Sequence, residues 1–117
     1  MKRDDDFLRD LLLSLEADPE WVFVHRAQLL KSSDPGKARY HFELAADAGL
    51  ITDFSSGTFR LTSTGHDYLA AIKDNGIWAK TKEVVAEQGG SASLEIMKNI
   101  AVAFVKKQIE QRTGLIV

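Results

Sequence analysis

Three residues in the second half of the chain, Ser63, His66 and Asp67, have the side-chain types of a hydrolytic triad. They fall within about one helical turn, whereas a triad needs side chains that converge from separate elements. The histidines, at positions 25, 41 and 66, lack the His-x-x-x-His spacing that holds a metal on one helical face. Gly89-Gly90 is not followed by the lysine and serine or threonine of a phosphate-binding loop. We therefore expect no catalytic residue, no metal site and no cofactor.

The composition is that of an ordinary globular protein and indicates no general preference for polyanions. The chain has 117 residues, of which 44% are hydrophobic and 27% charged, and its formal net charge is -2. Nucleic-acid binding would therefore depend on the local distribution of charge. The absence of cysteine excludes disulfides, thiolate zinc sites and cysteine nucleophiles.

The sequence predicts neither a membrane span nor a secretory signal. A span needs about 20 consecutive apolar residues, and the longest strongly apolar run is Ile100 to Val105. The N-terminal residues become acidic at Asp4, where a signal would be apolar. We expect a cytoplasmic protein that does not associate with membranes.

Two helices are predicted in the first half of the chain. The first carries leucines at the spacing of one helical face and ends at Asp18-Pro19, since the residue before proline avoids helical geometry. The second begins after the N-cap Asp34 and ends at Gly49. Between them, residues 21–24 have the aromatic and β-branched composition of a short strand. The stretch 26–33 fits either a short helix or a continuing extended segment.

A hairpin and three further helices are predicted in the rest of the chain. Leu50–Asp53 and Thr58–Leu61 have strand composition, and turn-forming residues join them. The helices are one capped by Thr62 and broken at Asn75-Gly76, one from Ile77 to Gln88, and one that starts near Ser91 or Ser93 and reaches about Arg112.

The helix ending in Ala48-Gly49-Leu50-Ile51, the hairpin, and the turn Leu61-Thr62-x-x-Gly65 together resemble winged-helix transcription regulators. In those proteins a recognition helix ends at Ala-Gly-Leu and the hairpin is the wing. Gly49 can supply the left-handed conformation by which the chain leaves the helix, and Gly65 allows a close helix approach. The predicted fold is therefore α+β, a winged helix over residues 4–76 followed by a helical extension, residues 77–117, with two additional C-terminal helices.

Further motifs resemble one uncharacterised bacterial family, the YjcQ-like proteins, which are often found near prophage genes. They are Met1-Lys2-Arg3-Asp4 with the leucine-rich helix, Tyr40-His41, Arg60-Leu61-Thr62-x-x-Gly65-His66-Asp67-x-Leu69, Ile77-Trp78-x-Lys80-x-Lys82 and Gly89-Gly90-Ser91. The resemblance implies a winged-helix fold and carries no established activity. The chain departs from standard helix-turn-helix proteins because the segment before Asp34 lacks a clear first helix, which weighs against DNA docking.

The most basic window of the chain, His25 to His41, overlaps the predicted recognition helix. Its lysines and arginines, opposed by Asp34 alone, are Arg26, Lys31, Lys37 and Arg39. In a winged helix this element would enter the major groove, where Arg or Lys can read guanine and Glu can accept from cytosine. The predicted contacts to double-stranded DNA are Lys37, Arg39, Tyr40 and Glu43 on the helix and Ser55, Ser56, Thr58 and Arg60 on the wing. Glu43 and Asp47 repel phosphate, so a solvated helix of mixed charge is the competing interpretation.

The C-terminal helices carry more apolar surface than a soluble monomer tolerates in the open. A two-fold homodimer is the commonest way to cover such a surface. The predicted interface residues are Trp78, Val85, Met97, Ile100, Phe104 and Ile109. A helix lying flat on a membrane is less consistent with the sequence, because the polar face is not strongly basic.

Two functions follow from these patterns. The first is a dimeric winged-helix DNA-binding protein, such as a small prophage-linked transcriptional regulator. The second is a non-catalytic protein-interaction module that uses the same scaffold without DNA, since a fold does not fix a function.

Overall fold

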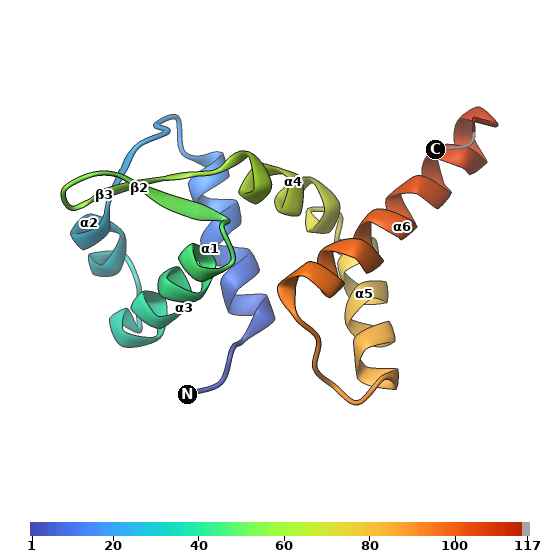
Figure 1. Ribbon diagram of the computed structural model, residues 1–117, viewed down its shortest axis with the longest axis horizontal. Helices are drawn as coiled ribbons and strands as arrows, with labels where there is room; N and C mark the ends of the chain where they lie inside the picture. The colour runs from blue at the N-terminus through green and yellow to red at the C-terminus, as the bar shows by residue number, and fades with distance from the viewer. Residues whose placement is uncertain (116–117) are drawn as a thin grey trace. The chain divides into compact units, whose positions relative to one another are not determined.

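The computed structural model describes residues 1–115, which form an α+β protein with six helices and a three-stranded antiparallel sheet (Figure 1). The elements are α1 (Asp5–Ala17), β1 (Phe23–Val24), α2 (His25–Leu30), α3 (Pro35–Asp47), β2 (Ile51–Ser55), β3 (Thr58–Leu61), α4 (Ser63–Ile72), α5 (Asn75–Glu87) and α6 (Leu94–Thr113). The chain divides into two compact units, Met1–Leu69 and a second that begins at Ala70.

Helix α1 forms where the leucine spacing predicts it. Leu8, Leu12 and Leu15 are buried. The Asp4 carboxylate caps the helix by accepting from the Phe7 N–H at 3.0 Å, and the chain leaves helical geometry at Asp18. The acidic start and the proline-adjacent end of this helix are therefore confirmed.

The sheet has the strand order β1-β3-β2. The predicted hairpin is confirmed as β2 and β3, with Ile51 opposite Leu61 and an irregularity between Asp53 and Ser55. The predicted strand at residues 21–24 is shorter than expected, because only Phe23-Val24 pairs with β3.

The core of the first unit lies between the sheet and the helices. The Phe59 ring on β3 lies 5.6 Å from the Phe23 ring and 5.3 Å from the Phe42 ring of α3, measured between centroids. The buried face of α3 consists of Ala38, His41, Phe42 and Ala45. Because this face of α3 packs against the core, the opposite face of the helix is exposed to solvent.

The ambiguous segment before Asp34 is helical, so the expectation that a first helix is missing was wrong. Residues 25–30 form α2, which packs against α3. The helix has only six residues and no side-chain cap at Val24. A helix this short and uncapped has little sequence signal, because its stability comes from packing.

The chain reversal after α3 is built from the predicted motif residues. Gly49 has φ 74°, and the Leu50 N–H donates to the Ala45 carbonyl at 2.8 Å. At the other end of the hairpin, the Thr62 N–H donates to the Leu50 carbonyl at 3.0 Å, and its hydroxyl donates to the Gly49 carbonyl. The same hydroxyl accepts from the Gly65 N–H at 2.9 Å. These bonds close the base of the hairpin and start α4.

In the second unit, helices α5 and α6 pack against each other. The predicted break at Asn75-Gly76 was misplaced, because the Asp74 carboxylate caps α5 by accepting from the Ile77 N–H at 2.9 Å. Asn75 and Gly76 are therefore the first residues of α5. Helix α6 begins at the Ser93 cap, as predicted, and ends at Gly114.

Candidate nucleic-acid interface

The open flank of α3 faces an open groove of about 820 Å³. Its walls are α2, α3 and the β2-β3 hairpin, and the polar side chains that line it are His25, Arg26, Arg39, Glu43, Thr52, Asp53, Ser55 and Ser56. We call this feature the α3 groove. It brings together four of the predicted DNA contacts, Arg39 and Glu43 of α3 and Ser55 and Ser56 of the hairpin.

Arginine side chains enter the α3 groove from two helices. Arg26 of α2 and Arg39 of α3 are both exposed and line it. Arg26 lies in the basic window but was not among the predicted contacts, because the segment that carries it had no assigned structure. A guanidinium can donate several hydrogen bonds to phosphate or to the guanine edge.

Acidic residues line the same groove. The Asp53 carboxylate lies 3.3 Å from the His25 Nε2 atom, and the His25 ring packs on Phe59 at 4.4 Å between centroids. Glu43 is exposed on α3. The groove therefore has mixed charge, and any nucleic-acid contact in it is directional rather than a general attraction.

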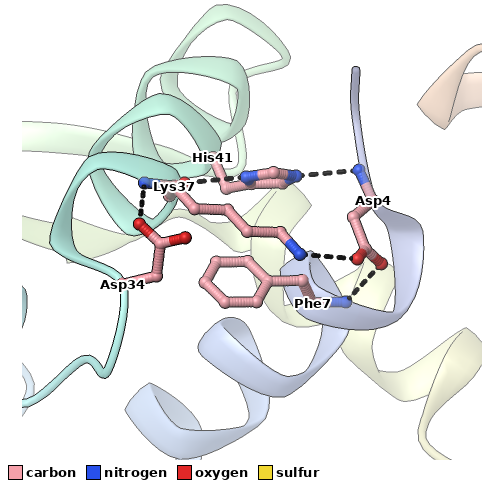
Figure 2. A network of polar contacts seen from close by, with 5 residues as sticks. All are labelled: Asp4, Phe7, Asp34, Lys37 and His41. Atoms are coloured by element: carbon pink, nitrogen blue, oxygen red, sulfur yellow. Dashed lines mark hydrogen bonds and ion pairs between the residues drawn. The ribbon is translucent and has the colours of Figure 1, made fainter. Parts of the chain in front are cut away.

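Lys37, a predicted DNA contact, forms an ion pair with another part of the chain (Figure 2). Its Nζ atom lies 2.8 Å from an Asp4 carboxylate oxygen and 4.6 Å from the centroid of the Phe7 ring. The Asp34 carboxylate caps α3 through the Lys37 N–H at 3.1 Å. The half-buried Lys37 ammonium thus holds α1 to α3, and a contact with DNA would have to compete with this ion pair.

His41 lies next to that ion pair and is fully buried. Its Nε2 atom is 2.8 Å from the Asp4 main-chain nitrogen, and its Nδ1 atom is 2.8 Å from the Lys37 carbonyl oxygen (Figure 2). A main-chain N–H can only donate and a carbonyl can only accept. The ring is therefore neutral, with its proton on Nδ1, and His41 is a hydrogen-bonding residue of the core.

The Lys37 hydrogen bond lowers the pKa of the Asp4 carboxyl, and the hydrogen bond from the Phe7 N–H adds to this effect. Both partners stabilise the charged carboxylate more than the neutral acid. Asp4 thus serves at once as helix cap, ion-pair partner and main-chain donor to His41.

The other predicted DNA contacts are partly buried or form hydrogen bonds within the chain. Tyr40 is half-buried, with its ring 5.4 Å from His41. The Ser55 N–H and hydroxyl both bond the Thr58 hydroxyl, at 3.0 and 2.7 Å, within the hairpin. The Arg60 side chain donates to the Leu61 carbonyl at 3.0 Å and lines a different groove, with Trp21 and His66. A positive strip joining Lys37, Arg39 and Arg60 is therefore absent from the α3 groove.

A family model described as hypothetical protein (DUF2513) matches residues 2–91. The chain belongs to the DUF2513 family. An uncharacterised protein of Haemophilus influenzae is 31% identical over 121 aligned residues, which cover 93% of this chain and 99% of the relative. No solved structure matches the chain. The YjcQ-like resemblance stays a prediction beside this assignment.

The match to the DUF2513 model ends at Ser91, before α6 begins at Leu94. Of the predicted dimer contacts, Trp78, Val85 and Met97 are buried within the single chain. Ile100 and Phe104 are half-buried, and Ile109 is 39% exposed. Periodicity identified the apolar positions of α6, but it does not say which of them the chain itself covers.

Within residues 1–115 of this DUF2513 protein, no three His, Cys, Asp or Glu side chains are grouped as metal ligands. None of the helices in that part of the chain is both long and apolar enough to cross a membrane.

Proposed function

We propose that the chain is a winged-helix protein that binds double-stranded DNA through the α3 groove. Its first unit has the parts of such a domain: the helix pair α2-α3, the hairpin as wing, and β1 against β3. The single observation that carries the proposal is the pair of exposed arginines, Arg26 and Arg39, on two helices of one groove. The resemblance to winged-helix transcription regulators extends the proposal to a regulatory role, and the YjcQ-like resemblance extends it to a link with prophage genes.

The mixed charge of the groove suits base reading more than tight phosphate binding. An α-helix fits the major groove, where Glu43 can accept from cytosine N4 and Arg39 can donate to guanine. Arg26 contacts phosphate in this arrangement and fixes the orientation of α3. Lys37 and Arg60 have no part in it, since both are bonded elsewhere.

Fluorescence polarization with a labelled random duplex, at several salt concentrations, tests the proposal. We expect binding that weakens with salt, and a log-log salt slope that falls by about 1 in the Arg26→Ala/Arg39→Ala variant, since each phosphate contact contributes about 0.9 and Arg26 makes one. Lys2→Ala/Lys80→Ala removes the same charge outside the groove and should leave the slope nearly unchanged. Absence of binding at low salt, or equal slopes for both double variants, would contradict the proposal.

The second candidate is a protein-interaction module without DNA, and exposed aromatic side chains favour it. Trp21 is 63% and Phe54 53% exposed, and their rings meet edge-on at 5.1 Å between centroids. Exposed aromatic residues mark protein contacts more often than DNA contacts. Salt-independent behaviour in the titration above, together with self-association through these residues, would favour this candidate.

A further inference from the structure

Helix α6 carries a second apolar stripe that its own chain leaves open. Leu94, Met97 and Ala101 are buried. Val102, Val105 and Ile109, spaced by three and four residues, lie on an adjacent face; the two valines are half-buried and Ile109 is exposed. We call these three residues the open stripe.

The open stripe reaches into a part of α6 that α5 does not accompany. Helix α6 has 20 residues and α5 has 13, so at 1.5 Å per residue α6 is longer by roughly 10 Å. The connection from α5 turns back toward the start of α5 before α6 begins, and the final turns of α6 run on past α5 (Figure 1). These turns need another partner for their apolar side.

The charges beside the open stripe are mainly positive. Lys98 and Arg112 lie at its two ends and Lys106 on its flank, and Lys107 follows directly, whereas Glu110 is the acid of that half of the helix. Two α6 helices packed on each other through this stripe would place these bases together, which is unfavourable. The charge pattern therefore calls for an acidic partner rather than a second α6.

The first unit carries an apolar groove of about 510 Å³ with an acidic rim. The end of α1, the segment before β1, β3 and the start of α4 form it. Its apolar wall includes Leu15, Pro19 and Trp21. Its acids are Glu16, Asp18 and Glu20, against Arg60 in the groove and Lys31, whose Nζ atom lies 3.9 Å from Asp18. We call it the acidic groove.

We propose that the open stripe of α6 in one copy docks in the acidic groove of a second copy, and that the second copy returns the same contact. The exchange gives a closed two-fold dimer with two equivalent interfaces. Val105 and Ile109 lie against Trp21 and Pro19, while Lys106 and Arg112 face Glu16 and Glu20. Trp21 also offers its ring face to a lysine or arginine. The contact does not depend on DNA binding.

Charge-reversed variants test this exchange by sedimentation velocity. Glu16→Lys/Glu20→Lys reverses the groove, and Lys106→Glu/Arg112→Glu reverses the helix. Each alone should dimerise at least about tenfold more weakly than the parent, because both interfaces lose two charge pairs and gain repulsion. An equimolar mixture should recover the parent affinity within about threefold, since both interfaces become complementary again.

The matched control is Glu83→Lys/Glu87→Lys, which makes the same charge change on the exposed side of α5 and should leave dimerisation unaltered. Trp21→Ser and Ile109→Ser probe the apolar halves of the same contact without altering charge, and each should weaken the dimer. Circular dichroism melting of every variant separates a lost contact from a lost fold.

Several results would overturn the exchange. The parent protein could be monomeric at every concentration. The groove-reversed variant could stay fully dimeric while the helix-reversed variant does not, which would mean that α6 pairs with itself. The mixture could fail to recover, or the monomer could bind vesicles of anionic phospholipid through α6 instead.

Discussion

His41 is a buried polar ring whose two nitrogens are both used by the main chain. The Asp4 N–H and the Lys37 carbonyl come from the start of α1 and from α3, so the ring ties the two helices together. A buried polar group with both partners present costs little, whereas its loss leaves the partners unsatisfied. The structure thus gives this histidine a structural role that needs no ligand.

Substitution of His41 by Phe should destabilise the protein although the ring shape is kept. The Asp4 N–H and the Lys37 carbonyl would lose their partner, and we expect a loss of about 2–4 kcal/mol in the free energy of unfolding. The midpoint of urea denaturation measures it. The same substitution at the exposed His66 should change stability by no more than about 0.5 kcal/mol, and equal losses at both positions would contradict this role.

The lowered pKa of Asp4 predicts a pH dependence with a definite sign. A carboxyl whose pKa is lower in the folded chain stabilises the fold above its ordinary value of 3.8, and that contribution disappears as pH falls through the folded value. Asp4→Asn can still cap α1 but loses the charge pair with Lys37. The urea midpoints of parent and variant should therefore differ at neutral pH and converge as pH falls below 3.8, through the lowered pKa of Asp4. A constant difference across this range would show that Asp4 does not titrate in the folded state.

At the scale of elements, the sequence patterns predicted the helices and strands that have capping residues or complete apolar faces. The α1 leucines, the hairpin, and the Ser93 start of α6 were all readable. Two features were not: α2 has no capping side chain, and α5 begins with Asn75-Gly76, residues that usually end helices. In both cases packing or a preceding Asp outweighs the local preference.

The candidate site was harder to predict than the fold. The sequence indicated the basic window and the outer flank of α3, and the groove contains Arg39 and Glu43 from it. It could not show that Lys37 pairs with Asp4, 33 residues away, or that Arg60 lines another groove. Such assignments depend on contacts distant in sequence, which periodicity does not report.

Replacement by alanine should have opposite effects on the free energy of unfolding at Gly65 and at Gly36. A Cβ at Gly65 would lie 2.1 Å from the Leu50 carbonyl oxygen, where backbone meets backbone. Gly65→Ala should therefore cost about 3 kcal/mol of unfolding free energy. At Gly36, in the first turn of α3, the nearest atom is 3.8 Å away, and Gly36→Ala should stabilise by up to about 1 kcal/mol. Thermal melting of both variants measures the sign, and a destabilised Gly36→Ala or a neutral Gly65→Ala would refute this account.

At the scale of the whole molecule, the two proposals use different surfaces. The α3 groove lies on the first unit, with its basic residues on α2 and α3. The acidic groove lies on the same unit but is lined by the end of α1, residues 18–21 and the start of α4. A dimer formed through the acidic groove would not use the residues that line the α3 groove, and two linked DNA-binding surfaces would raise avidity. The salt titration and the charge-swap experiment can therefore fail independently.

The base of the hairpin is closed by Thr62, which bonds Gly49, Leu50 and Gly65 at once. Because of these bonds, the main chain enters and leaves the hairpin at one fixed point, and this point does not depend on the length of the hairpin. The tip at Ser56 and Gly57 is exposed and lines the α3 groove, so insertions or grafted loops there would alter that groove without disturbing the closure at Thr62. The hairpin is thus the place where this scaffold can change its length, and with it its specificity, without refolding.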